Sequence, residues 1–296
     1  MIITVTLNPA LDLTYTVAAL IPHGTHRVTA VHERPGGKGI NVAGVLHALG
    51  EPVLTTGLLG GNTGSRVEAL LTTEGIPAAF VPIAGETRRT VAVADGEDAT
   101  GFWEPGPEIS AAEWAAFLDR FGRLVGEGDV VALSGSLPPG VPIEGYAELV
   151  RLAASAGART VLDTSGEALR YGWAAGPDLA KPNAAELAEV FPDGVPAPGP
   201  GAVVVSHGPA GLVACTASGT WRAEPPEQLT GNPTGAGDAC VAALARGLRD
   251  GTPWPALLTD VVALSAAAVA APAAGVIDLP TYRRLLPAHV VGNVAR

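Results

Sequence analysis

The chain has 296 residues, of which 47% are hydrophobic, and its 18 basic and 29 acidic side chains give a net charge of −11. This length suits one large domain, or one domain with a small appendage, and the apolar content is sufficient for a large core. A chain this acidic has no basic surface with which to neutralise phosphates, so we expect neither nucleic acid nor an anionic membrane as a partner. An anionic ligand must instead be held by a local group of residues.

Cysteine usage and terminal segments indicate the compartment. Cys215 and Cys240 are the two cysteines, without CxxC spacing, which argues against a disulfide framework and a zinc site. The start of the chain lacks the basic segment of a signal peptide, so we expect a cytoplasmic protein. Residues 261–277 carry no charge, but Ser265 and Pro272 interrupt them. We therefore predict a buried helix there rather than a membrane span.

Short β-branched runs alternate along the chain with alanine- and leucine-rich segments of helical length. This alternation is typical of βαβ units over a parallel sheet. We predict strands at 2–7, 53–58, 79–83, 130–133, 160–162, 179–181, 203–206 and 212–216, and helices at 40–49, 64–74, 111–125, 143–156, 184–191 and 236–248. Residues 13–31 and 90–103 alternate in strand fashion with no helix between them, which predicts a small separate sheet acting as a lid.

The glycine-rich segment 36–41, GGKGIN, contains one of only two lysines in the chain, Lys38; the other is Lys181. Glycines allow close backbone approach, and the amides at the start of the following helix can hold an anion. The segment is not a Walker A loop, because no glycine lies five residues before Gly37 and no Ser or Thr follows Lys38. A plain glycine turn leading into a helix is the alternative interpretation.

The segment 232–238, NPTGAGD, precedes a helix with apolar residues on one face. Its small residues let successive amides point to one spot, where the helix dipole also stabilises negative charge. Asp238 is well placed there as a base that takes a proton from an attacking hydroxyl. The alternative is an Asp that stabilises the helix dipole. Cys240 replaces the third glycine of a dinucleotide fingerprint, which argues against a dinucleotide enzyme.

Two further segments follow predicted strands. In 181–186, Asn183 and Glu186 have the spacing of an N-cap and its N3 partner, so they either cap a helix or act as outer ligands of a hydrated Mg²⁺. The sequence leaves both interpretations open. The segment 134–140, SGSLPPG, is by itself a turn with polar side chains at a strand end, where α/β sheets place ligand-binding loops.

Taken together, the chain resembles the ribokinase-fold carbohydrate kinases of the phosphofructokinase B family from end to end. GGKGINVA at 36–43 and NPTGAGD at 232–238 carry most of the likeness, with TLNPALD at 6–12, SGSLPPG at 134–140 and KPNAAEL at 181–187 in the expected order. The resemblance implies a ribokinase-like three-layer α/β/α fold with a mostly parallel central sheet and a small β-sheet lid. It implies a single domain over 1–296, with lid strands at approximately 11–34 and 87–105.

The resemblance also implies a role for each matching residue. Asp238 is the expected base, with the amides of Gly235, Ala236 and Gly237 as an anion hole. The expected substrate-binding residues are Asp12, Gly37, Lys38, Asn41, Arg88 and Ser136, with Lys38 and Arg88 on the phosphate that the sugar already carries. The expected ATP-binding residues are Lys181, Asn183, Ser206, Gly208, Gly211 and Gly237. Asn183 and Glu186 are expected to hold Mg²⁺ through water, and residues 261–274 to wall the adenine pocket.

The implied activity is transfer of the ATP γ-phosphoryl group to a ketohexose phosphate, by a phosphotransferase with an alcohol acceptor. The lysine in the first motif resembles the branch of fructose-1-phosphate and tagatose-6-phosphate kinases. Trp103, where an asparagine is usual in fructose-1-phosphate kinases, and the Asn232–Pro233 opening favour tagatose 6-phosphate as substrate and tagatose 1,6-bisphosphate as product. A 1-phosphofructokinase and a non-catalytic sugar-phosphate-binding regulator are the alternatives. ATP and Mg²⁺ are the expected cofactors; a monovalent cation and a homodimer remain hypotheses.

Overall fold

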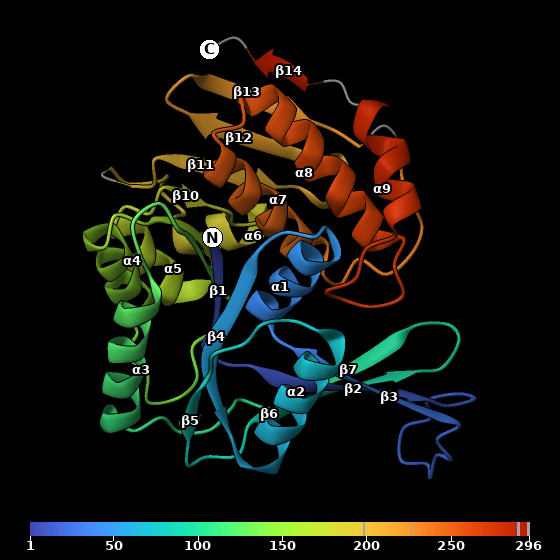
Figure 1. Cartoon of the computed structure of the whole chain (residues 1–296). Coiled ribbons are helices and arrows are strands. Elements are labelled where there is room, and N and C mark those ends of the chain that lie inside the picture. Colours follow the sequence, from blue (N-terminus) through green and yellow to red (C-terminus); the bar gives the residue numbers. More distant parts are fainter. Residues whose placement is uncertain (198, 226, 289–290, 295–296) are drawn as a thin grey trace.

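A ten-stranded sheet forms the centre of the molecule (Figure 1). The computed structural model describes residues 1–197, 199–225, 227–288 and 291–294. The strand order is β14-β13-β12-β11-β10-β9-β8-β1-β4-β5. The strands are β1 (Ile2–Thr6), β4 (Val53–Gly60), β5 (Val81–Ile83), β8 (Val130–Ser134), β9 (Arg159–Asp163), β10 (Leu179–Ala180), β11 (Ala202–Ser206), β12 (Leu212–Thr216), β13 (Gly219–Ala223) and β14 (Val291–Val294).

The sheet is parallel from β5 to β11 and antiparallel from β11 to β14. Every residue of β1 and β8 is buried, because helices cover both faces of the parallel part. This explains why these strands read as continuous apolar runs. The order reverses at β1, which lies between β4 and β8, so a crevice is expected at the carboxyl ends of these strands.

Helices pack on both faces of the sheet and make the three-layer fold that the motifs imply. One hydrophobic cluster joins one face to α1 (Lys38–Ala48), α2 (Gly61–Glu74), α7 (Ala236–Asp250), α8 (Trp254–Val269) and α9 (Leu279–Leu285). The other joins the opposite face to α3 (Ala111–Leu124), α4 (Gly145–Ser155), α5 (Gly166–Ala174) and α6 (Ala184–Val190). Short 3-10 turns complete the set, η1 (Gly208–Ala210) and η2 (Leu286–Ala288).

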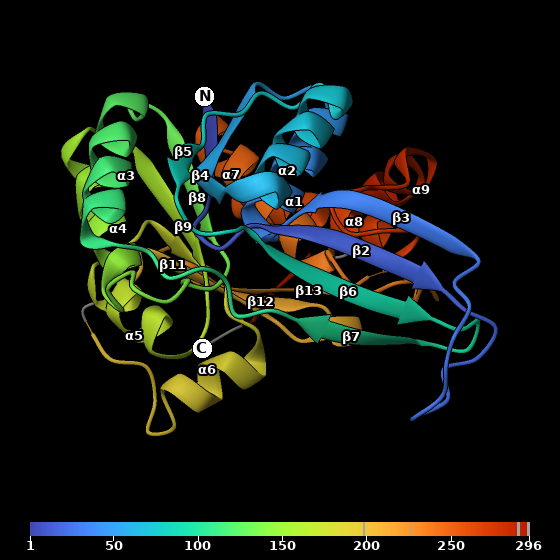
Figure 2. The same cartoon turned by 90° about the horizontal axis from the view of Figure 1, so that it is seen from below.

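A second sheet of four strands projects from this body, as Figure 2 shows. Its order is β3-β2-β6-β7, formed by β2 (Ala10–Thr16), β3 (Ala30–Gly36), β6 (Arg88–Ala94) and β7 (Ala99–Trp103). Both segments with strand-like alternation and no helix contribute to it. We call these four strands the small sheet.

The structure contains the buried helix predicted within 261–277 as the second half of α8, but that helix ends at Val269. Bends and turns occupy the chain around Pro272, which lacks the N–H a helix needs. Helix α5 and strand β13 were not predicted from the sequence. Helix α1 begins at Lys38, two residues before the predicted start, since Gly37 has a φ of 110° and ends the preceding strand conformation. No helix of the described residues is long and apolar enough to cross a membrane.

Candidate active site

The order of the strands places polar groups from four strand ends at one edge of the main sheet. Asn8 follows β1, Ser134 ends β8, Asp163 ends β9 and Lys181 directly follows β10. These strands are neighbours, and Ser134 is paired with Asp163 in the register of β8 and β9. Because parallel strands present their carboxyl ends at the same edge, the side chains meet where the small sheet joins the body.

The amino end of α7 lies above this edge. Gly235 is its N-cap with φ 90°, a conformation that an L side chain rarely adopts, and a Cβ there would lie 2.8 Å from Cα of Ala274. The amide of Ala236 donates to the carbonyl oxygen of Pro233 at 3.2 Å. First-turn amides of a helix lack intrahelical acceptors and attract anions. Of the three amides predicted to form the anion hole, that of Ala236 is therefore engaged within the turn, and those of Gly235 and Gly237 have no backbone acceptor among the described residues.

Asp238 lies in the first turn of α7, only 5% exposed. Its Oδ2 accepts a hydrogen bond of 2.8 Å from Nδ2 of Asn41 in α1, which leaves Oδ1 for another proton donor. Burial, reinforced by the negative charge of Asp163, raises the pKa of Asp238 to about 7, although Asn41 and the nearby lysines favour its ionised form. A carboxylate with a pKa near neutrality is suited to general-base catalysis.

Asp163 connects the two lysines of the chain. Its Oδ2 lies 3.4 Å from Nζ of Lys38, and its Oδ1 lies 3.2 Å from Nζ of Lys181. Burial opposes ionisation of Asp163, but the two ammonium groups outweigh it and hold its pKa below the usual value. Asp163 was not among the predicted site residues; the available signal was an acid directly after the hydrophobic strand predicted at 160–162.

The small sheet contributes a second polar group. Asp12 of β2 accepts a hydrogen bond from the hydroxyl of Thr90 in β6, and burial raises its pKa despite Arg88 and Arg34 nearby. Gly36 of β3 leaves room for this carboxylate, because a Cβ there would lie 2.2 Å from Cγ of Asp12. Asp12 is therefore held across three strands with its charge near two guanidinium groups.

Arg88 lies where the small sheet meets the main sheet. Its Nε donates to the carbonyl oxygen of Asn8 and its Nη1 to that of Glu104, each at 3.2 Å. The side chain of Asn8 donates to the carbonyl oxygen of Pro105 at 3.0 Å and to Oγ of Ser136 at 3.2 Å. Arg88 and Ser136 are thus brought together through Asn8. Asn8 was not among the predicted site residues.

Lys38 and Arg88, predicted to share one phosphate, contact different groups in the structure. Lys38 pairs with Asp163 at the strand ends, whereas Arg88 donates to backbone carbonyls at the base of the small sheet. Trp103 lies opposite Thr90 in the register of β6 and β7 and is 74% exposed. Because directly opposed residues share a face, Trp103 lies on the face of the small sheet that carries Asp12.

The residues predicted for ATP and Mg²⁺ gather around α6. Asn183 forms a bridge with Ser206 at the end of β11, and Gly208 and Gly211 form the turn between β11 and β12 with φ values of 58° and 86°. Asn183 and Glu186 make a complete capping box, with both hydrogen bonds at 2.8 Å. Helix capping therefore accounts for their spacing.

The capping box still leaves one carboxylate oxygen for a metal. Glu186 uses Oε2 for the cap, and within the described residues Oε1 has no hydrogen-bond partner. Among those residues no three His, Cys, Asp or Glu side chains cluster as a metal cage. Mg²⁺ with a nucleotide usually keeps several waters and takes one or two carboxylates besides phosphate oxygens. Glu186 fits that mode of binding.

Comparison with known proteins identifies the class. Residues 5–281 match the pfkB family carbohydrate kinases, so the chain belongs to this family. Phosphofructokinase-2 from Escherichia coli, in a crystal structure with potassium, has 29% sequence identity and a TM-score of 0.91 over 97% of this chain and 98% of that one. A possible 1-phosphofructokinase from Thermotoga maritima has 27% identity and a TM-score of 0.85 over 99% of both chains.

The fold is shared more widely. Arabidopsis thaliana ribokinase, crystallised with ribose and ATP, has 19% identity and a TM-score of 0.73 over 96% of this chain and 98% of that one. The ribokinase-like fold that the motifs imply is therefore confirmed. With the family match and the two phosphofructokinase neighbours, this defines the chain as a sugar-phosphate kinase, a phosphotransferase with an alcohol group as acceptor.

Proposed function

We propose that the protein transfers the γ-phosphoryl group of ATP to a primary hydroxyl of a ketohexose phosphate, with tagatose 6-phosphate as the substrate and tagatose 1,6-bisphosphate as the product. The observation that carries the proposal is the pairing of Asp238 with Asn41 at the amino end of α7. At this position a base lies in the same helix turn as open backbone amides. Phosphoryl transfer to a hydroxyl requires both a base and such donors.

In the transfer, the substrate hydroxyl oxygen forms a bond to the γ-phosphorus as the bond from phosphorus to the β–γ bridging oxygen of ATP breaks, and ADP leaves. The hydroxyl proton passes to Oδ1 of Asp238, since Asn41 occupies Oδ2. Open first-turn amides of α7 stabilise the developing negative charge, while Lys38 and Lys181 add positive charge beneath them. Closure of the small sheet over the sugar excludes water.

ATP and Mg²⁺ are assigned to the side of the site near α6. Asn183, Ser206, Gly208 and Gly211 lie together there, and we assign the nucleotide to them and to Gly237 and Lys181. Mg²⁺, held through water by Glu186 and Asn183, supplies charge neutralisation on the nucleotide phosphates when bound. A monovalent cation is a further proposal, supported by the potassium in the crystal structure of phosphofructokinase-2 from Escherichia coli.

Residues of the small sheet favour a sugar substrate that already carries a phosphate group. Arg88 is a cation at the junction with the body, where Ser136 lies close through Asn8, and Asp12 offers a carboxylate to sugar hydroxyls. Trp103 on the same face favours tagatose 6-phosphate. Fructose 1-phosphate is the second candidate, supported by likeness to the possible 1-phosphofructokinase from Thermotoga maritima. A non-catalytic regulator fits less well, because Asp238 and the glycine turn are intact.

The test is initial ADP release with Mg²⁺ and ATP against tagatose 6-phosphate, fructose 1-phosphate, fructose 6-phosphate and unphosphorylated fructose, with Asp238→Asn as the blank. We expect tagatose 6-phosphate to give the highest kcat/KM and the variant to lose turnover. Preference for another ketose phosphate would overturn the choice of sugar. Binding of sugar phosphates without turnover would instead favour the regulator.

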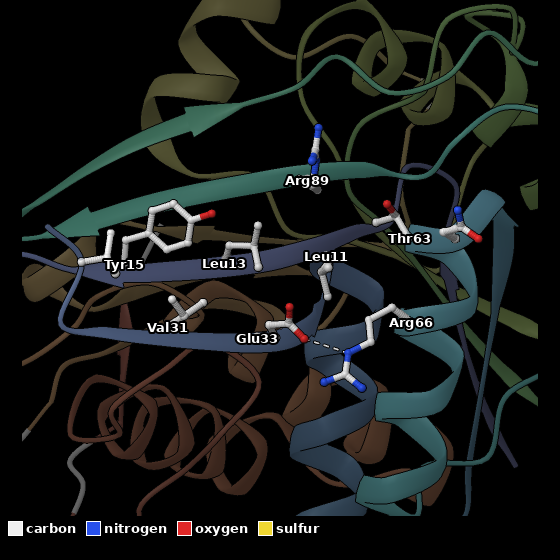
Figure 3. A pocket seen from close by; sticks show the side chains of 10 residues that line it. Leu11, Leu13, Tyr15, Val31, Glu33, Thr63, Arg66 and Arg89 are labelled. Atoms are coloured by element: carbon white, nitrogen blue, oxygen red, sulfur yellow. Dashed lines mark hydrogen bonds and ion pairs between the residues drawn. The ribbon is translucent and has the colours of Figure 1, made fainter. Parts of the chain in front are cut away.

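The face of the small sheet turned away from Asp12 supports a homodimer. It carries a groove of about 550 Å³ between β2, β3, β6 and α2, shown in Figure 3. Leu11, Leu13, Tyr15 and Val31 line it, and Glu33 pairs with Arg66 at 2.7 Å on its wall. Apolar side chains on an unpartnered sheet face favour association.

We propose that a second copy covers this groove. Val31, 54% exposed, is suited to the test because Val31→Glu would place a charge within the covered surface. Sedimentation over a concentration series is expected to show a wild-type dimer and a monomeric variant. A wild-type protein at monomer mass throughout would overturn the dimer. Cytoplasmic localisation is also proposed; it is supported by Cys215 and Cys240, which are both free.

A further inference from the structure

Asp163 has no role in the reaction as proposed above, yet it is the most buried charge at the site. It is 1% exposed, whereas Lys181 is 4% exposed and the side chain of Lys38 is 41% exposed. Its two carboxylate oxygens face different lysines, at 3.2 and 3.4 Å. Burial of an unpaired carboxylate costs free energy, and both ammonium groups offset this cost for Asp163.

The positions of the two lysines indicate where a transferring phosphoryl group would bind. Nζ of Lys181 lies 3.6 Å from the position that a Cβ on Gly237 would take, so it lies beneath the first turn of α7. Lys38 is the first residue of α1, one turn before Asn41, which holds Asp238. The ammonium groups therefore approach the amino end of α7 from two different elements, and Asp163 is the group that joins them.

We propose that Asp163 is a positioning residue for phosphoryl transfer: it anchors Lys38 and Lys181 so that both ammonium groups face the transferring phosphoryl group beside Asp238. The proposal rests on the proposed kinase function and deepens it. Lys38 depends on the anchor more than Lys181 does, because its long side chain is partly exposed and is otherwise free to turn into solvent.

The anchor also sets the charge around Asp238. Lys38 and Asn41 face this carboxylate from α1, Asp163 from the end of β9 and Lys181 from the segment after β10. The cluster of Lys38, Lys181, Asp163 and Asp238 carries two positive and two negative charges when Asp238 is ionised. When Asp238 takes the substrate proton, the net charge of the cluster rises from zero to +1. This change coincides with formation of the new phosphate ester, whose negative charge it helps to neutralise.

The test compares pH profiles of kcat/KM for the phosphorylated sugar at saturating ATP and Mg²⁺. The acid limb of the wild-type profile is expected near pH 7, where Asp238 titrates. Asp163→Asn removes a negative charge that raises the pKa of Asp238, so its acid limb moves to lower pH while kcat falls about 10- to 100-fold. Lys38→Met removes a positive charge that lowers this pKa, so its acid limb moves to higher pH.

Two controls separate positioning from folding. Asp163→Glu keeps the charge but displaces it, so kcat falls while the acid limb stays closer to the wild-type position than in Asp163→Asn. Asp178→Asn removes a carboxylate that accepts from the amide of Thr160 at 2.8 Å, at the opposite end of β9 and β10. It is expected to change thermal stability without moving the profile.

Failure of this inference is distinguishable from failure of the proposed function. If wild-type protein phosphorylates a sugar but Asp163→Asn keeps its kcat and acid limb, the anchor is overturned and the kinase stands. A loss in Asp163→Asn that higher Mg²⁺ restores would also overturn it, because Asp163 would then act on the metal. If wild type turns over no sugar, the proposed function fails, and carboxyl NMR titration of Asp238 still tests the anchor. Lys38→Met is expected to raise the pKa of Asp238 in the wild-type background but much less in the Asp163→Asn background, where Lys38 no longer faces this carboxylate. An equal rise in both backgrounds overturns the anchor.

Discussion

The edge of the main sheet and the small sheet divide the site into two unlike halves. At the edge, Asp163, Lys181 and Asp238 are at most 5% exposed and lie on strand ends and a helix start. On the small sheet, every residue of β7 is exposed or half-buried, and Trp103 is 74% exposed. The buried half fixes charges rigidly, because burial leaves each side chain few alternative partners. The exposed side chains of the small sheet have fewer fixed partners, which is the property that closure on a ligand would require.

The largest expected effect is at the buried half. Asp238→Asn keeps the shape of the side chain but removes the base, so kcat should fall by about 10²- to 10⁴-fold while the KM values change little. Steady-state kinetics with the preferred sugar phosphate measures this. A variant that retains more than a tenth of wild-type kcat would show that the base lies elsewhere.

The next largest effect is expected from a substitution in the exposed half, and it should change KM rather than kcat. Arg88→Met removes a charged donor worth about 1.5–3 kcal/mol, so the KM for the sugar phosphate should rise about 10- to 100-fold with the KM for ATP unchanged. The matched control is Arg89→Met, because its neighbour Arg89 pairs with Glu104 at 3.0 Å on the exposed surface. Equal effects of both substitutions on KM would remove Arg88 from the substrate site.

The smallest effect on activity is expected from a charged cluster far along α7. Arg246 donates to Asp260 at 2.6 Å and to the hydroxyl of Tyr282 at 2.8 Å, joining α7, α8 and α9. Arg246→Met leaves Asp260, 14% exposed, without its main partner, which should cost about 1–3 kcal/mol in the free energy of unfolding.

Denaturant unfolding measures the loss, and kcat should stay at the wild-type value. The control Arg284→Met breaks an exposed pair with Glu227 and should cost less than about 1 kcal/mol. A fall in kcat for Arg246→Met would show that the far end of α7 is coupled to its amino end, so that the buried half of the site depends on contacts outside it.

Local sequence patterns were sufficient to predict the main strands and the presence of a second sheet. The β-branched runs predicted β1, β4 and β8, and the alternating segments predicted a second sheet, because burial on two faces and burial on one face leave different periodicities. The capping box of Ser110 and Glu113 at α3 could also be read from spacing, since both of its hydrogen bonds lie within one turn.

Pairings between distant residues could not be read in this way. Asn41 and Asp238 are 197 positions apart, and Asp163 belongs to no motif in the sequence. An acid after a strand is usually a solvated loop residue. The order of β9 and β10 in the sheet brings Asp163 next to Lys181, and the packing of α1 on the sheet brings Lys38 to its other side.

The sequence by itself determined the fold class, the glycine turns before α1 and α7 and the acid at the start of α7, because these depend on residues close together in the chain. Tertiary structure decided which charges meet: the partners of Asp238, the anchor on the lysines and the separation of Lys38 from Arg88. The reason is that strand order and helix placement set these distances, and both arise from packing over the whole core rather than from any single segment.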